Sequence, residues 1–170
     1  MERYLIEIQG IVQGVGFRPF VWRCAKKFKI KGLVKNTGNG VLIEAEGKKI
    51  RGFLEEIKNN FPPAAEIEKI FIKTLPPKFY KNFLIEKSRK EKEAFTFIPP
   101  DLATCKECQK DIFSQKNRRY YYPFTNCTNC GPRFTIIKSL PYDREKTTMK
   151  VFEMCQKCQK EYELSLIHIS

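Results

Sequence analysis

The second half of the sequence carries cysteines at a spacing suited to metal binding. Cys105 and Cys108 form one Cys-x-x-Cys pair, and Cys127 and Cys130 form another after eighteen intervening residues. Paired knuckles at this spacing are typical of a zinc ion held by four thiolates. A redox pair or buried thiols are the alternatives, but two equally spaced pairs are more than a redox motif needs. We therefore predict one structural Zn²⁺ at these four residues.

A third pair, Cys155 and Cys158, would begin a second zinc site of the same kind. Its partner pair would be due about eighteen residues further on, beyond Ser170. We expect this second site to be half-built or free of metal, unless a ligand from outside the chain completes it. The seventh cysteine, Cys24, lies on the apolar stripe of a predicted helix, and we interpret it as a core residue.

A glycine-rich segment from Gly10 to Arg18 joins a predicted strand to a predicted helix. Glycines let the backbone turn with its N–H groups inward, the helix start adds a partial positive charge, and Arg18 supplies a forked cation. Together these groups would bind an oxyanion. The alternative is a tight turn whose arginine faces solvent. A second polar position, Asn36, places a neutral amide at the end of a strand that leads into a hairpin, where an ordinary turn asparagine is the alternative.

The apolar pattern predicts the elements that must position these residues. Residues 3–9 alternate as in a strand, and apolar residues at helical spacing predict helices over residues 17–28 and 50–61. Further strands are expected at residues 33–37, 41–46, 67–73 and 83–87, with an Asn-Gly turn between the first two. The order β-α-β-β-α-β with a short extra strand is the ferredoxin-like pattern. We predict an α+β fold.

Two domains are expected. Residues 87–93 contain no apolar side chain and read as a solvated linker, and Pro99-Pro100 opens the cysteine-rich part. We place the first domain at residues 1–92 and a small four-cysteine zinc-finger domain at residues 93–170. Because the first domain has its own two-helix core, we expect it to keep its activity when the metal is removed.

Composition limits the partners and the compartment. The chain has 32 Lys and Arg against 19 Asp and Glu, a net charge of +13. Most of the excess lies in residues 1–90, where a solvated Lys-rich surface or a preference for an anionic ligand would explain it. The longest apolar stretches are only a few residues, which excludes a membrane span. The acidic start at Glu2 is unlike a secretory signal, so we expect a cytoplasmic protein.

The two polar motifs match a known family. Residues 10–18 (Gly-Ile-Val-Gln-Gly-Val-Gly-Phe-Arg) and residues 32–40 (Gly-Leu-Val-Lys-Asn-Thr-Gly-Asn-Gly) resemble the signatures of acylphosphatase. The resemblance covers residues 1 to about 90, and it implies that Arg18 binds phosphate and that Asn36 orients a water molecule. The phosphate loop implied by the resemblance comprises Gln13, Gly14, Val15, Gly16, Phe17 and Arg18. With the phosphoryl group held and a water in line, no side-chain nucleophile is needed.

The cysteine region resembles the zinc fingers of the HypF hydrogenase-maturation carbamoyltransferases. The matching stretches are residues 127–135 (Cys-Thr-Asn-Cys-Gly-Pro-Arg-Phe-Thr), 141–144 (Pro-Tyr-Asp-Arg) and 154–158 (Met-Cys-Gln-Lys-Cys). The resemblance implies an N-terminal part of such an enzyme that cleaves carbamoyl phosphate, in the synthesis of cyanide ligands for [NiFe] hydrogenase, with the carbamoyl acceptor HypE as partner. The family's nucleotide-binding and carbamoyl-transferring domains are absent, and residues 164–170 do not resemble it. We therefore expect a truncated end.

Two other functions compete with this interpretation. Residues 118–122 (Arg-Arg-Tyr-Tyr-Tyr) could grip phosphates and stack bases, as in a basic zinc-finger RNA-binding module. Packing of these rings over the small metal domain is the interpretation we favour, so nucleic-acid binding is not expected. The first domain also has the topology of RNA-recognition modules, but the predicted strand at residues 41–46 lacks the aromatic residues that base stacking needs. A non-catalytic interaction module is the remaining alternative.

Overall fold

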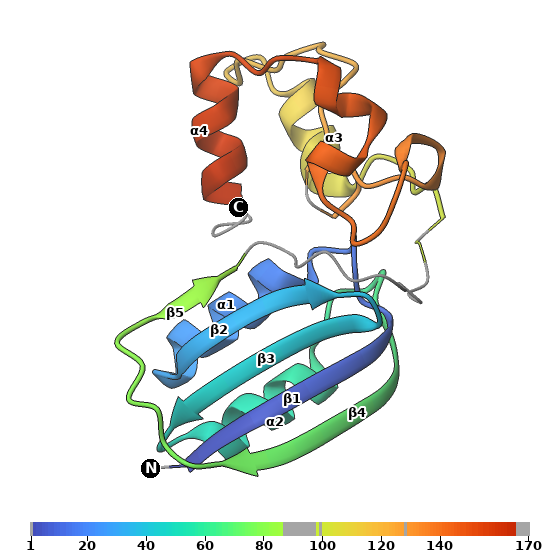
Figure 1. Ribbon diagram of the computed structural model, residues 1–170. Helices are drawn as coiled ribbons and strands as arrows, with labels where there is room; N and C mark the ends of the chain where they lie inside the picture. The colour runs from blue at the N-terminus through green and yellow to red at the C-terminus, as the bar shows by residue number, and fades with distance from the viewer. Residues whose placement is uncertain (1, 87–97, 99, 128, 166–170) are drawn as a thin grey trace.

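The computed structural model describes residues 2–86, 98, 100–127 and 129–165 (Figure 1). The sheet domain contains the following elements: β1 (Glu2–Ile11), α1 (Phe17–Phe28), β2 (Lys31–Thr37), β3 (Gly40–Gly47), α2 (Ile50–Asn59), β4 (Glu66–Leu75) and β5 (Phe83–Ile85). The cysteine-rich region contains α3 (Lys106–Phe113), α4 (Gln156–Ser165) and the 3-10 turns Phe134–Ile136, Arg144–Lys146 and Thr148–Val151. The predicted boundary at residue 92 lies outside the described residues.

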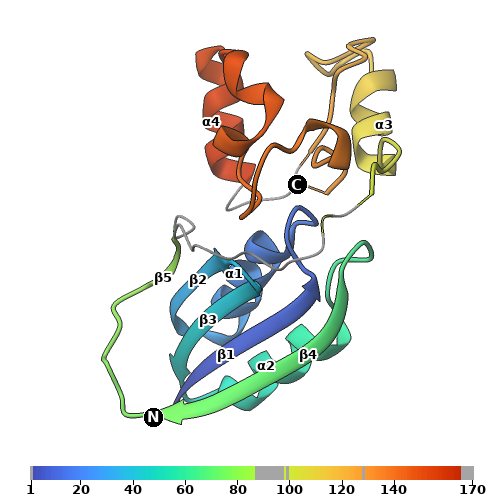
Figure 2. The same cartoon turned by 45° about the vertical axis from the view of Figure 1, so that its right-hand side comes forward.

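The five strands form one sheet in the order β4-β1-β3-β2-β5. The pairs β1–β4, β1–β3 and β2–β3 are antiparallel, and the short edge strand β5 pairs with β2 in parallel. Both helices of this domain lie on the same face of the sheet (Figures 1 and 2). The predicted α+β fold with its extra strand is therefore confirmed. Pairing between β1 and β4 shifts register between Gln9 and Gly10, just before the glycine-rich loop begins.

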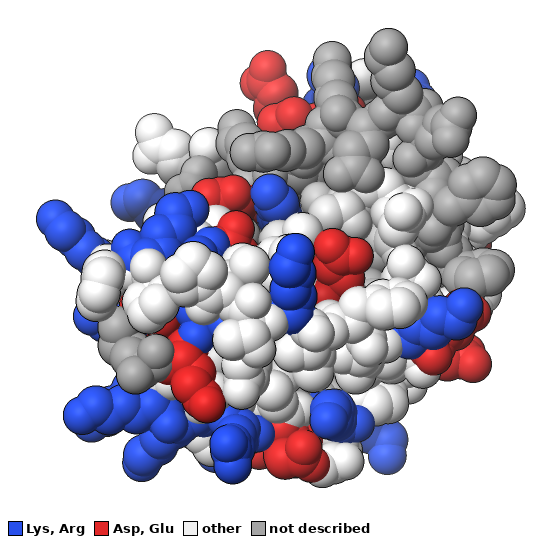
Figure 3. All heavy atoms as spheres, turned by 60° about the horizontal axis from the view of Figure 1, so that its bottom comes forward, with Lys and Arg blue, Asp and Glu red and all other residues white. Residues whose placement is uncertain are grey.

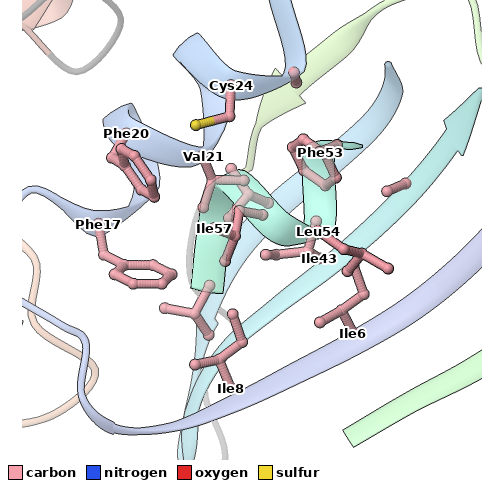
Figure 4. Close-up of a cluster of buried hydrophobic side chains, with 14 of the residues drawn as sticks. Ile6, Ile8, Phe17, Phe20, Val21, Cys24, Ile43, Phe53, Leu54 and Ile57 are labelled. Atoms are coloured by element: carbon pink, nitrogen blue, oxygen red, sulfur yellow. The ribbon is translucent and has the colours of Figure 1, made fainter. Parts of the chain in front are cut away.

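The helices and the sheet enclose a continuous apolar core. Phe17, Phe20, Val21 and Cys24 of α1 face residues from α2, β1 and β3 (Figure 4). The Cys24 side chain is only 4% exposed, and burial raises the pKa of its thiol to about 11. This cysteine is a core residue, as the helical spacing predicted. The core fixes the start of α1 against the sheet, and the glycine-rich loop leads directly into that start.

The cysteine-rich region has a much smaller core. Among its described residues, the only apolar side chains below 9% exposure are Cys108, Cys130, Pro141 and Tyr142. Two of these four are predicted metal ligands. Most of the region consists of turns and short 3-10 segments between α3 and α4. A region with so little buried apolar surface needs another source of stability, and a bound metal is the usual one.

The aromatic run in this region is more exposed than the sequence suggested. We expected the rings to pack over the metal domain, but Tyr120, Tyr121 and Tyr122 are 37%, 68% and 55% exposed. That expectation was wrong, because the cysteine cluster rather than a ring-filled core occupies the centre of the region. The neighbouring arginines are engaged: both Arg118 and Arg119 pair with Glu161 of α4.

Surface charge is spread over the sheet domain. On the face shown in Figure 3, Lys and Arg side chains are interspersed with Asp and Glu around a neutral centre. This distribution agrees with a solvated Lys-rich surface more than with a single basic patch on that face. In the described part of the chain, no helix has the length and apolar character needed to cross a membrane.

Candidate active site and metal centre

Four cysteine sulfurs converge on one point. The Sγ–Sγ distances are 3.7 Å for Cys105–Cys127, 3.9 Å for Cys127–Cys130 and 3.7 Å for Cys108–Cys130, and all four sulfurs lie within 4.8 Å of one another. In a tetrahedral Zn site with Zn–S bonds of about 2.3 Å, the sulfurs are about 3.8 Å apart. The cluster therefore has the donor set and the spacing that a tetrahedral metal ion requires. The sequence predicted these same four residues.

Local backbone structure shapes the second knuckle. The Asn129 N–H points at the Cys127 sulfur at 3.4 Å, and the Gly131 N–H donates to the Cys127 carbonyl oxygen at 2.7 Å. A Cβ atom on Gly131 would lie 2.6 Å from that same oxygen and 2.5 Å from the Asn126 side chain. Only glycine fits at this point of the turn, which explains why glycine follows the last cysteine of the pair.

The protonation of the cluster depends on a cation. Burial raises the pKa of Cys127 to about 11 and raises that of Cys108 further. In Cys130, burial also favours the neutral thiol, but hydrogen bonds to the sulfur outweigh it and lower the pKa. Metal ligands must be thiolates, so a bound cation would reverse the effect of burial. The residues present fit a structural metal.

The third cysteine pair differs from the first two. Cys155 is exposed, and Cys158 lies 3.6 Å from the Nη2 atom of Arg118. Within the described residues, no group of three or more metal-ligating side chains includes this pair, and the cluster of four is the single such group. Among the described residues this pair has no further ligand, and the half-built or metal-free second site stays a prediction.

The glycine-rich loop forms an array of backbone donors. Gly14 and Gly16 adopt left-handed conformations (φ 69° and 74°), and Gly16 caps α1 with no side chain bonded to the helix start. None of the N–H groups of residues 14–18 has an acceptor within the described part of the chain. Such orphan donors at a helix N-terminus attract an anion. The buried side chains of Val15 and Phe17 fix the loop to the core.

Gln13 has a different role from the rest of the loop. Its Nε2 atom donates to the carbonyl oxygens of Thr37 (2.7 Å) and Gly40 (2.8 Å), and its Oε1 atom accepts from the Tyr142 N–H (3.0 Å). The side chain is therefore engaged with the β2–β3 turn and is not available to a phosphoryl oxygen. The resemblance predicts that Gln13 binds phosphate, and only its backbone N–H could make that contact.

Arg18 and Asn36 lie close together. The Nη2 atom of Arg18 donates to Asp143 Oδ1 (2.9 Å) and approaches the Tyr142 carbonyl oxygen (3.5 Å), which also accepts from Asn36 Nδ2 at 3.3 Å. Asn36 is 1% exposed, and its buried Oδ1 atom has no hydrogen-bond partner among the described residues. A buried, unpaired acceptor is costly, so a water molecule is the natural partner for it.

The glycine after the β2–β3 turn brings Asn36 to the loop. A Cβ atom on Gly40, whose φ is 145°, would lie 2.1 Å from the carbonyl oxygen of Ile8. The absence of a side chain lets the hairpin approach β1 closely, and Asn36 pairs with Val41 directly beside this point. The spacing of Asn36 and Gly40 in the sequence thus has a geometric reason.

Sequence reasoning did not place Tyr142 and Asp143 at this site. They lie in the cysteine-rich region, more than 100 residues from Asn36 and Arg18 along the chain. The stretch Pro-Tyr-Asp-Arg was noted only as a similarity to zinc fingers. No periodicity or spacing predicts a contact at this separation, so the sequence held no signal for it. Figures 1 and 2 both show this region against the end of the sheet where the loop after β1 lies.

Comparison with known proteins gives the same two parts. The family model for acylphosphatase matches residues 4–85, and the model for the HypF finger matches residues 104–137. The probable carbamoyltransferase HypF of Methanocaldococcus jannaschii is 50% identical over 144 residues, which is 82% of this chain, and the carbamoyltransferase HypF of Synechocystis is 44% identical over 154 residues, 89% of this chain. The chain belongs to the HypF family. It spans about a fifth of the length of these HypF relatives.

Solved structures and a shorter relative complete the comparison. A crystal structure of full-length HypF in the phosphate- and nucleotide-bound form superposes with a TM-score of 0.90 at 48% identity, covering 95% of this chain and 22% of that one. The HypF of T. kodakarensis gives a TM-score of 0.82 at 51% identity, covering 96% of this chain and 21% of that one. The acylphosphatase of Thermotoga petrophila is 42% identical over 89 residues, 51% of this chain and 98% of that protein. The sheet domain of this HypF-family chain is therefore also an acylphosphatase domain.

Proposed function

We propose that this chain hydrolyses acyl phosphates, carbamoyl phosphate in particular, as part of a longer carbamoyltransferase of [NiFe] hydrogenase maturation. The observation that carries the proposal is the meeting of Arg18 and Asn36 at one carbonyl oxygen, at 3.5 Å and 3.3 Å, beside the N–H groups of residues 14–18, which have no acceptor among the described residues. A cation, an array of donors and a neutral amide with a free oxygen are the groups that this reaction needs.

In the proposed mechanism, the N–H groups of residues 14–18 and the guanidinium of Arg18 bind the phosphoryl oxygens. The free Oδ1 atom of Asn36 accepts a hydrogen bond from a water molecule and holds it for attack on phosphorus. A P–O bond to water forms as the P–O bond to the acyl group breaks. The products are inorganic phosphate and, from carbamoyl phosphate, carbamate. The acyl group is a good leaving group, so the positioning of water and phosphate suffices without a nucleophilic side chain.

We propose zinc for the cluster of Cys105, Cys108, Cys127 and Cys130, because four thiolates at tetrahedral spacing select Zn²⁺ among common metals. All four ligand positions are filled by protein, so the ion would be structural rather than catalytic. None of the seven cysteines is paired in a disulfide, which favours a reducing compartment, and we propose the cytoplasm. We propose two domains, residues 1–92 and residues 93–170. The family resemblance implies that the longer protein transfers the carbamoyl group to HypE.

The test is phosphate release by the full 170-residue chain with carbamoyl phosphate as substrate. Arg18→Ala removes the only charged side chain of residues 10–18 and should lower kcat/KM at least a hundredfold, since a charge-assisted hydrogen bond contributes about 1.5 to 3 kcal/mol and Arg18 can make two. Arg23→Ala is the matched control, because Arg23 is exposed and lies on the same helix. It should retain the wild-type rate.

Two results would contradict the proposal. Phosphate release by Arg18→Ala at the rate of Arg23→Ala would exclude the loop as the site of hydrolysis. RNA binding by the wild-type chain without any hydrolysis would favour the nucleic-acid alternative. Retention of folded structure in the variants is checked by circular dichroism.

A further inference from the structure

Two residues of the cysteine-rich region sit directly on the proposed hydrolytic residues. Asp143 accepts from Arg18 at 2.9 Å, with 15% of the Arg18 side chain and 31% of the Asp143 side chain exposed. The peptide group of Tyr142 is bonded on both sides: its carbonyl oxygen accepts from Asn36 and its N–H donates to Gln13. One dipeptide thus holds three residues of the sheet domain, two from residues 10–18 and one from β2.

Each contact uses one atom and leaves the chemically useful atoms free. Both contacts of Arg18 are made through Nη2, and among the described residues its Nε and Nη1 atoms have no acceptor. Asn36 uses Nδ2, and its Oδ1 has no partner in the described part of the chain. A bound amide nitrogen fixes which way the Asn36 carboxamide faces, so its oxygen is directed away from Tyr142. Arg18 is likewise tethered at one end, with two donors left for a phosphoryl group.

We propose that Asp143 and the peptide group of Tyr142 are positioning residues of the acyl phosphate hydrolase, so that the cysteine-rich region completes the active site of the sheet domain. The inference rests on the proposed function. Asp143 fixes the direction of the Arg18 guanidinium, and the Tyr142 carbonyl fixes the Asn36 amide. Both groups act through another side chain and touch no reacting atom.

The metal centre is connected to this dipeptide. The Tyr142 hydroxyl accepts from the Arg133 N–H at 2.9 Å, and Arg133 lies three residues after the metal-ligating Cys130. Tyr142 is 8% exposed and this hydrogen bond is partly buried, so it is partly shielded from competing water. We therefore expect hydrolysis to be lost when the metal is removed, contrary to the expectation from the sequence. Loss of the metal should release Tyr142 and Asp143 from the site.

A competing role for Asp143 makes the opposite prediction. A carboxylate on the phosphate-binding arginine could act as an internal competitor of the substrate. A competitor would be expected to accept hydrogen bonds from two nitrogen atoms of the guanidinium group, as a bidentate carboxylate does. Asp143 makes a single contact to one nitrogen, which favours positioning.

The experiment compares Asp143→Ala, Asp143→Asn and the control Glu145→Ala in the full chain, measuring kcat and KM for carbamoyl phosphate. Glu145 carries the same charge two residues away, and it is exposed. Asp143→Ala should lower kcat about tenfold to a hundredfold, as a misplaced catalytic group does. Asp143→Asn keeps an Oδ1 acceptor for Arg18 and should recover most of the lost kcat. Glu145→Ala should leave both constants unchanged.

The outcomes are separable from the test of the proposed function. A lower KM with unchanged or higher kcat in both Asp143 variants would show a competitor and overturn the inference. Unchanged constants, or an equal loss of kcat in both variants, would overturn it as well. Arg18→Ala is measured in parallel, and full activity of this variant refutes the hydrolytic site itself. If Arg18→Ala is inactive but both Asp143 variants keep the wild-type constants, only the positioning role is refuted.

Discussion

Removal of the metal should unfold the cysteine-rich region and leave the sheet domain folded. The sheet domain buries twenty apolar residues in one cluster, whereas the described part of the cysteine-rich region buries four, two of them proposed metal ligands. Ordering a residue costs about 1 to 2 kcal/mol of backbone entropy, and a buried side chain returns about 1.5 to 3 kcal/mol. Four buried side chains cannot offset the ordering of the several dozen residues around them. A structural zinc contributes about 10 to 16 kcal/mol in small fingers, which makes the metal the largest single stabilising contribution there.

The assay is amide hydrogen exchange measured by mass spectrometry, before and after the metal is removed with a strong chelator. Peptides from residues 104–151 should lose protection, and peptides from β1, β3 and α2 should keep it. Phosphate release should fall together with the metal content and return when Zn²⁺ is added back. Metal content is measured by elemental analysis, which should give one zinc per chain. The double variant Cys155→Ser/Cys158→Ser should retain that zinc.

Two results would refute the reasoning on the metal. Full protection of residues 104–151 in protein shown to be metal-free would mean that the region is stable on its own contacts. Undiminished hydrolysis by protein whose cysteine-rich region has unfolded would show that the sheet domain needs no support from Tyr142 and Asp143. A second tightly held zinc would show that the third cysteine pair binds metal.

Three further changes test the site and its scaffold. Asn36→Ala should lower kcat about a hundredfold or more, measured by phosphate release, because the water loses its acceptor. In Glu44, burial favours the neutral form, but hydrogen bonds from Tyr80 and Arg3 outweigh burial and lower the pKa of the carboxyl group. The charged carboxylate therefore stabilises the folded protein above the pKa of the unfolded state. This contribution is lost as the pH falls through the pKa of the folded state. Glu44→Gln should therefore cost about 1 kcal/mol in urea unfolding at pH 7 and almost nothing once the pH is below the folded pKa of Glu44, and an equal cost under both conditions would contradict this. Gly40→Ala, whose Cβ would lie 2.1 Å from a β1 carbonyl oxygen, should lower the unfolding free energy by at least about 2 kcal/mol, and a neutral effect would show that the hairpin can move away from β1.

The elements of the sheet domain were predictable because local patterns determine them. The alternation over residues 3–9 corresponds to β1, which is one residue longer at its start and two at its end, and the helix predicted over residues 17–28 has the same ends as α1. The metal cluster was predictable for a similar reason, since the geometry of two Cys-x-x-Cys knuckles depends on short spacings. The order of elements pointed to the ferredoxin-like pattern, but the order of the strands in the sheet was not predicted, because neighbours such as β1 and β4 are distant in sequence.

Long-range contacts were not predictable in this way. The pairing of Arg18 with Asp143 joins two segments whose local patterns say nothing of each other. The hydrogen bonds of the Gln13 side chain to the β2–β3 turn were not predicted either, because the local sequence around a glutamine does not indicate its distant hydrogen-bond partners. The exposure of Tyr121 and Tyr122 reversed an expectation based on composition, since a metal-centred region does not need its rings as a core.

The central claim is that water held by Asn36 attacks phosphorus bound at Arg18 and the loop. The most direct measurement is hydrolysis of carbamoyl phosphate in ¹⁸O-labelled water, with the isotope content of the released phosphate determined by mass spectrometry and compared with the reaction without protein. We predict one ¹⁸O atom in each phosphate formed by the wild-type chain, and loss of this enzymatic label in Arg18→Ala. Phosphate released at the enzymatic rate without ¹⁸O would show that the C–O bond breaks instead of the P–O bond and contradict the mechanism.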